Sequence, residues 1–73
     1  MKSIDLHGYK VADTEKFFYD QLNAARLKST LVEVMCITGT GVIRERLLAL
    51  AKENDLNHYV PMSNRGCIVI EFE

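Results

Sequence analysis

The sequence lacks tryptophan altogether, and its 73 residues include only one proline, four glycines and two cysteines. So few glycines and prolines, with a hydrophobic fraction of 48%, are typical of a folded domain rather than a disordered or low-complexity chain. A chain of this length has room for a single hydrophobic core. We therefore expect one domain that spans residues 1–73.

The two cysteines do not form a metal-binding pattern. Cys36 and Cys67 each lie within an apolar run, and neither belongs to a Cys-x-x-Cys or Cys/His cluster with the spacing of a zinc site. We expect both thiols to be reduced and buried in the core, with a disulfide between them as the alternative. No metal-ligating residues are predicted from this pattern.

The chain also lacks a long hydrophobic run and a charge of one predominant sign. No segment approaches the roughly 18 apolar residues that a membrane span requires, and Asp5 interrupts the N-terminus before a signal-peptide core can form. We therefore expect no membrane association and a cytoplasmic protein. The net charge is −1, so any affinity for nucleic acid must come from a local basic surface.

Four segments have the patterns of β-strands. Period-two alternation predicts a strand over residues 3–7, and apolar, β-branched runs predict strands over residues 30–38 and 67–72. A short edge strand is expected within residues 56–61, where a proline closes the segment, and residues 62–66 have the composition of a turn-rich loop.

Two segments have apolar residues at helical spacing. The first predicted helix begins at Asp13 or Thr14, either of which is a suitable N-cap, and ends at about Arg26. The second begins at Ile43 and ends at about Asn54. The positions expected to face the core are Phe18, Leu22 and Ala25 in the first helix and Ile43, Leu47, Leu50 and Ala51 in the second.

The resulting order, β-α-β-α-β-β, predicts an α/β fold: a small mixed four-stranded sheet with two helices packed against it. The first two strands are joined through a helix, so we expect them to be parallel with a right-handed crossover, which places their carboxyl ends at one edge of the sheet. The loops that follow these two strands are therefore expected to lie side by side.

Asp5 and His7 stand at the end of the first predicted strand. A period of two puts both side chains on one face, with alpha carbons about 6.6 Å apart, so the carboxylate and the imidazole can interact directly or through a water. A histidine that titrates near neutrality can give or take a proton, and a neighbouring carboxylate can fix its tautomer or stabilise its charged form. The alternative is that Asp5 caps the loop and His7 is a polar residue at a strand end.

A loop with two glycines, Gly39 and Gly41, joins the second strand to the second helix. Free backbone N–H groups at the start of that helix would face an incoming phosphate, and Arg44 or Arg46 could add charge-assisted contacts. The alternative is an ordinary glycine turn with a solvated Arg44. No Gly-Lys-Ser/Thr follows, and Arg44 stands where a dinucleotide fingerprint needs its third glycine, so we expect no nucleotide cofactor.

Two residues just after the first loop's glycine are further candidates. Lys10 is placed to contact a phosphate, with a solvated lysine as the alternative. Tyr9 is placed to stack on an unpaired base, with a packing role as the alternative.

Three segments resemble motifs of the small MutS-related (Smr) domain family. Residues 4–8, Ile-Asp-Leu-His-Gly, resemble the Leu-Asp-x-His-Gly motif that opens this domain. Residues 38–44, Thr-Gly-Thr-Gly-Val-Ile-Arg, are similar to its His/Thr-Gly-x-Gly-x-Leu-Arg motif, and residues 64–66, Asn-Arg-Gly, resemble its closing glycine-containing turn. The motifs stand in the family's order, so the resemblance spans essentially the whole chain.

The resemblance implies a β-α-β-α-β-β fold, similar to the C-terminal domain of a bacterial translation initiation factor, and nicking or endonuclease activity on DNA or RNA. Carried over by position, Asp5 and His7 are the catalytic or substrate-positioning residues. Gly39 and Gly41 carry over as the loop on the phosphate side, and Arg44 is the matching arginine.

Two positions depart from the family pattern. Thr38 stands where many members have histidine, and Thr40, within the predicted phosphate-binding loop, stands where lysine is frequent. One acid–base group and one phosphate-binding cation are therefore missing. These departures make a non-catalytic module that binds nucleic acid, the ribosome or another ribonucleoprotein the alternative to an enzyme, and a protein-interaction domain the third hypothesis.

The leading hypothesis is an endonuclease, a phosphodiester hydrolase that nicks or cleaves nucleic acid, with RNA favoured over DNA. In RNA the 2′-hydroxyl can be the nucleophile, so a histidine-based site needs no metal. In DNA water must attack, which makes a divalent ion such as Mg²⁺ or Mn²⁺ near Asp5 more attractive. Salt-dependent binding without cleavage would instead identify the binding module.

Overall fold

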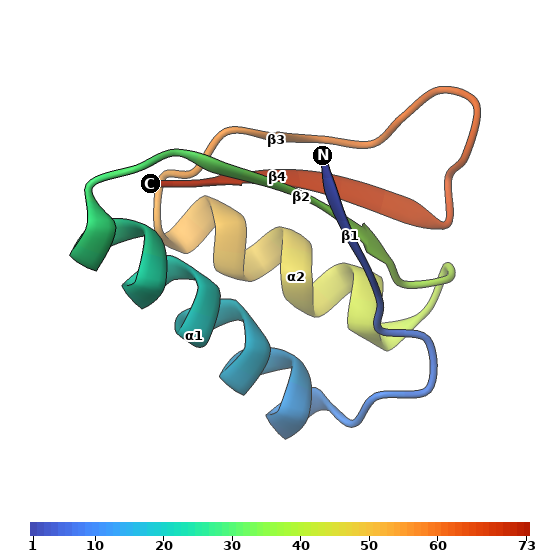
Figure 1. Cartoon of the computed structure of the whole chain (residues 1–73). Coiled ribbons are helices and arrows are strands. Elements are labelled where there is room, and N and C mark those ends of the chain that lie inside the picture. The colour runs from blue at the N-terminus through green and yellow to red at the C-terminus, as the bar shows by residue number, and fades with distance from the viewer.

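Six elements follow one another in the predicted order β-α-β-α-β-β (Figure 1). The computed structural model describes every residue from 1 to 73. The elements are β1 (Lys2–Asp5), α1 (Val11–Lys28), β2 (Val32–Ile37), α2 (Val42–Glu53), β3 (His58–Tyr59) and β4 (Cys67–Phe72). The predicted α/β fold is therefore confirmed.

The four strands form one mixed sheet in the order β1-β2-β4-β3. β1 runs parallel to β2, and β4 is antiparallel to both β2 and β3. The parallel pair confirms the expectation drawn from the helical connection between these strands. At their carboxyl ends the backbone N–H of Leu6 donates to the carbonyl of Ile37 at 2.8 Å, so the loops that follow start from one edge of the sheet.

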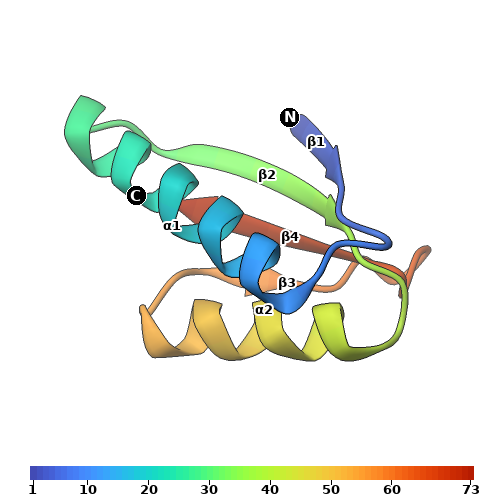
Figure 2. The ribbon, with the colours of Figure 1, turned by 90° about the horizontal axis from the view of Figure 1, so that it is seen from below.

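Both helices lie on the same face of the sheet, as Figure 1 and Figure 2 show from two directions. Val34 and Cys36 of β2 stand opposite Ile70 and Ile68 of β4, and all four belong to the buried core. Ile43, which was also expected in the core, is only partly buried. The other helix positions predicted to face the core are buried: Phe18, Leu22, Ala25, Leu47, Leu50 and Ala51.

The two cysteines are free and buried, as the sequence predicts. Cys67 stands opposite Ile37 in the β2–β4 ladder, and Cys36 is the preceding residue of β2. Because successive strand residues point to opposite faces, the two thiols face away from each other and cannot form a disulfide. Burial, with a smaller contribution from Cys67, raises the pKa of Cys36 to about 12, so this thiol stays protonated and unreactive at neutral pH.

The start of α1 differs from the prediction. The helix begins at Val11 with Lys10 as its N-cap, whereas Asp13 or Thr14 was expected there. The Thr14 side chain is buried, and its hydroxyl donates to the carbonyl of Lys10 at 3.0 Å, one turn earlier. The hydroxyl is therefore used inside the helix and not as a cap. α1 also continues to Lys28, two residues beyond the predicted end.

Two strands are shorter than predicted. β1 ends at Asp5, and after the hydrogen bond from Leu6 the chain turns at His7 and Gly8. β2 lies inside the predicted range 30–38. The short edge strand β3 and the final strand β4 lie where the sequence places them. Neither helix has the length and apolar character needed to cross a membrane.

Candidate functional site

Three loops meet where β1 and β2 end. The backbone N–H groups of Thr38 and Gly39 both donate to the carbonyl of Gly66, at 2.7 and 3.0 Å, which joins the loop after β2 to the turn before β4. A Cβ atom placed on Gly39 would lie 3.6 Å from Cδ2 of His7. The imidazole of His7, from the loop after β1, therefore packs beside Gly39.

An open groove of about 730 Å³ lies between the loop after β1 and the loop after β2. His7 and Lys10 are exposed residues of its first wall, and Tyr9 beside them is 42% exposed. The second wall includes Gly39, Thr40 and Gly41 and continues into the first turn of α2. The structure thus brings five of the predicted site residues together: His7, Lys10, Gly39, Thr40 and Gly41.

Asp5 acts on the backbone of this loop. Its Oδ1 atom accepts a hydrogen bond from the backbone N–H of His7 at 2.9 Å. The imidazole itself forms no hydrogen bond or ion pair with that carboxylate, and Asp5 does not line the groove. The contact is the one expected if Asp5 caps the loop, and it fixes the position from which the His7 side chain departs.

The first turn of α2 is left open toward the groove. No side chain caps this helix, and the backbone N–H groups of Thr40, Gly41, Val42 and Ile43 have no acceptor within the chain. Gly39 differs from the expectation for this loop, because its N–H is already used by the turn before β4. The remaining N–H groups and the positive end of the helix dipole favour an anion at this position.

Arg44 does not line the groove of His7. It lines a neighbouring groove of about 320 Å³ together with Arg65, from the turn before β4. Its one ion pair is with Glu45, the next residue in the sequence, at 3.3 Å. The sequence analysis did not identify Arg65 as a site residue. Because β4 is antiparallel to β2, the turn before β4 lies at the edge of the sheet where β2 ends, and this topology was the signal that could have found Arg65.

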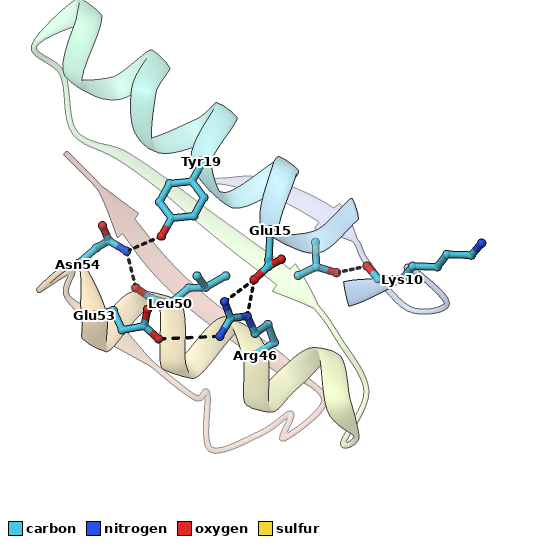
Figure 3. A network of polar contacts seen from close by, with 8 residues as sticks. Lys10, Glu15, Tyr19, Arg46, Leu50, Glu53 and Asn54 are labelled. Atoms are coloured by element: carbon cyan, nitrogen blue, oxygen red, sulfur yellow. Dashed lines mark hydrogen bonds and ion pairs between the residues drawn. The ribbon is translucent and has the colours of Figure 1, made fainter. Parts of the chain in front are cut away.

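Arg46 belongs to the contact between the two helices (Figure 3). Its Nε donates to Oε2 of Glu15 at 2.8 Å, a second guanidinium nitrogen donates to the same oxygen, and Glu53 lies 3.9 Å away. The hydrogen bonds that Arg46 donates to Glu15 raise the pKa of Arg46 above its usual range. Arg46 therefore pairs with α1 and does not line the groove of His7, so the structure does not bring it together with the other predicted phosphate-binding residues.

The two threonines that depart from the family pattern differ in exposure. Thr38 is only 4% exposed, and its hydroxyl lies 2.8 Å from the carbonyl of Gly39 and 3.3 Å from that of Gly66. Thr38 therefore holds two loops together. Thr40 is exposed on the wall of the groove and presents a hydroxyl where a lysine would present a cation.

A resident divalent ion does not fit the side chains present. No group of three or more histidine, cysteine, aspartate or glutamate side chains comes together in the structure. A closed protein site for a divalent ion takes several such oxygen or nitrogen ligands around one point. The side chains at this edge of the sheet therefore form no closed protein site for a metal, whereas the free N–H groups are donors for an anion.

No protein-family model and no curated protein matches this sequence. Among solved structures, the crystal structure of the Smr domain of Thermus thermophilus MutS2 matches with a TM-score of 0.73 and 21% sequence identity. The match covers 100% of this chain and 99% of that domain. At this identity the likeness shows the fold, which agrees with the expectation from residues 4–8 and 38–44.

Proposed function

Taking the Smr-like fold of the whole chain as the premise, we propose that the protein is an endonuclease that cleaves RNA, with His7 as the group that moves the proton. The observation that carries the proposal is one groove that holds both the exposed imidazole and the uncapped first turn of α2. An acid–base group and fixed N–H donors are two of the components that phosphodiester cleavage uses.

The phosphate is held by the start of α2. The free backbone N–H groups of Thr40, Gly41 and Val42 donate to its oxygens, and the helix dipole favours the negative charge. Lys10 lines the same groove and adds a positive charge from the opposite wall. The same donors stabilise the extra negative charge that the phosphate gains in the transition state.

Cleavage of RNA then needs no further reactant. Neutral His7 accepts the proton of the 2′-hydroxyl, the 2′ oxygen attacks the phosphorus, and the bond from phosphorus to the 5′ oxygen breaks. The leaving 5′ oxygen takes a proton from solvent. The products are a 2′,3′-cyclic phosphate and a 5′-hydroxyl. Asp5 is a positioning residue, because it holds the backbone of His7 and not its ring.

The lack of converging metal-ligating side chains is our reason to favour RNA over DNA. DNA has no 2′-hydroxyl, so a water must be activated, and metal-ligating side chains do not converge here to do so. The chemistry of the groove therefore suits free RNA, or the RNA of the ribosome or another ribonucleoprotein.

A binding module without turnover is the second candidate. It is favoured by the geometry of Asp5, whose carboxylate is bonded to the amide of His7 and leaves the ring without a hydrogen-bonded partner. In the Ser-His-Asp arrangement such a partner fixes the tautomer of the histidine. In this case the same groove binds RNA and releases it without cleavage.

The two candidates are separated by cleavage of labelled single-stranded and structured RNA, and of nicked and branched DNA, with and without chelator. His7→Ala should lower the rate of RNA cleavage by about 10²- to 10⁴-fold, the typical contribution of an acid–base group. The unfolding temperature should not change, because His7 is exposed. Asp5→Ala should have a smaller effect, since it loosens the loop without removing the ring.

His58→Ala is the matched control, because this second histidine lies in β3 and contacts the carbonyl of Leu56, outside the groove. Cleavage at the wild-type rate in His7→Ala would refute the role of His7 and the site built around it. Salt-sensitive binding of uncut RNA by the wild type would establish the binding module, and absence of both binding and cleavage would leave only a protein-interaction domain.

A further inference from the structure

We propose, on the basis of the proposed function, that the groove between Arg44 and Arg65 binds the nucleotide next to the cleaved phosphate, and that the substrate is single-stranded at this nucleotide. The resemblance to the Smr family places Arg44 in a motif and assigns no role to Arg65. The two arginines come from segments far apart in the sequence and line the same small groove.

This groove adjoins the groove of His7. Ile43 lines the groove of His7, and the next residue, Arg44, lines the second groove. On the other wall, Arg65 directly precedes Gly66, whose carbonyl accepts the N–H of Gly39. A strand held at the first turn of α2 therefore has the second groove immediately beside it.

One of the two positive charges of the second groove has no ion-pair partner, and the other is paired with a glutamate that is mostly exposed. Arg65 is exposed and forms no ion pair, and the partner of Arg44 is a glutamate side chain that is 72% exposed. The Arg44 side chain is 25% exposed, so the pair is open to solvent on the glutamate side, where a phosphate can replace the carboxylate. Arg46 provides the contrast, because its guanidinium is bonded to Glu15 across the helix contact.

The other three residues that line the second groove are apolar. Val60 and Pro61 are partly buried, and the side chain of Met62 is 100% exposed. Methionine sulfur makes favourable contacts with aromatic rings, and a guanidinium plane stacks on a base. The groove volume of about 320 Å³ is at the lower end of ligand pockets and suits one nucleotide.

These contacts require an unpaired nucleotide. In a duplex the faces of the bases are covered by their stacked neighbours, so Met62 and the arginine planes could not reach them. Proteins that bind single strands combine positive charge along the backbone with contacts to base faces. The combination of Arg44, Arg65 and Met62 has both features.

The test is the affinity of the wild type and of Arg65→Gln, Met62→Ser and Lys52→Gln for one RNA oligonucleotide, single-stranded or annealed into a duplex, at several salt concentrations. Arg65→Gln should weaken single-strand binding by about tenfold. It should also reduce the slope of log affinity against log salt by about 0.7, the value for one phosphate contact on a single strand. Met62→Ser should weaken binding without changing that slope.

Lys52→Gln is the charge-matched control. It removes one positive charge from the last turn of the same helix, at the end opposite the groove, and should leave binding and slope unchanged. Equal effects of Lys52→Gln and Arg65→Gln would overturn the inference, because total charge would then explain the binding. A wild type that binds the duplex as tightly as the single strand would overturn it as well.

These failures are distinct from failure of the proposed function. If Arg65→Gln binds and cuts like the wild type while His7→Ala is inactive, the second groove is wrong and the endonuclease stands. If His7→Ala cuts like the wild type, the endonuclease site is wrong, and the single-strand groove, which rests on it, is overturned with it.

Discussion

The two ends of α2 differ in whether a side chain caps the helix. At the C-terminal end the side-chain amide of Asn54 donates to the carbonyl of Leu50 at 2.9 Å and lies 3.5 Å from the hydroxyl of Tyr19 (Figure 3). At the N-terminal end no side chain caps the helix, and the N–H groups of Val42 and Ile43 have no partner in the chain. One end is satisfied by the fold, whereas the other leaves its donors available to a ligand.

The arginines around this helix differ in the same way, because some are paired within the fold and others are not. Arg46 is bonded to Glu15 and closes the contact between the helices, whereas Arg44 and Arg65 have at most an exposed neighbour as partner. With a net charge of only −1, the chain can bind an anionic polymer only where its cations are not paired internally. This contrast is our reason to place function at the N-terminal end of α2.

Of the substitutions near the N-terminal end of α2, Gly39→Ala should have the largest effect on stability. Gly39 has a φ of +71°, and an alanine in this left-handed region costs about 1–2 kcal/mol. The free energy of unfolding in denaturant should fall by that amount. RNA cleavage should fall as well, because the strained backbone belongs to the loop that packs against the ring of His7.

Gly41→Ala is the control for this change. Gly41 has a φ of −105° and no atom within 4 Å of an added Cβ, so the substitution should cost less and leave His7 in place. If both variants lost the same stability, the left-handed backbone at Gly39 would not be the cause.

At the C-terminal end of α2, Asn54→Ala should lower the free energy of unfolding slightly. The variant loses the side-chain hydrogen bond to the carbonyl of Leu50, which is worth about 0.5–1.5 kcal/mol, while the backbone N–H of residue 54 still donates to that carbonyl. RNA binding and cleavage should not change. Asn23→Ala, at an exposed position of α1, provides a control without a side-chain hydrogen bond. Loss of RNA binding in Asn54→Ala would contradict the division between the two ends.

The order and type of the elements could be predicted because the buried residues of each helix or strand recur at the period of that element. Leu47 and Leu50 recur at helical spacing because one face of α2 covers the sheet, and β4 is an apolar run that only Glu71 interrupts. The start of α1 could not be predicted from local preference. Thr14 is a good N-cap residue, but packing buries its side chain, and its hydroxyl finds an acceptor one turn earlier.

The arrangement of the candidate site was predictable where it follows from topology. Parallel strands joined through a helix end at one edge, which brings His7 beside Gly39. The roles of the arginines depend on partners that are distant in the sequence. Positions 44 and 46 are separated by about 200° around the helix, so one arginine meets Glu15 of α1 and the other meets the segment before β4.

The most direct test of the open end is to follow the backbone amide resonances of isotope-labelled protein while short single-stranded RNA is added. The account predicts salt-sensitive shifts at Thr40, Gly41, Val42 and Ile43, with the side-chain amide of Asn54 unaffected. Shifts centred on Asn54, or spread evenly over both ends of α2, would contradict it.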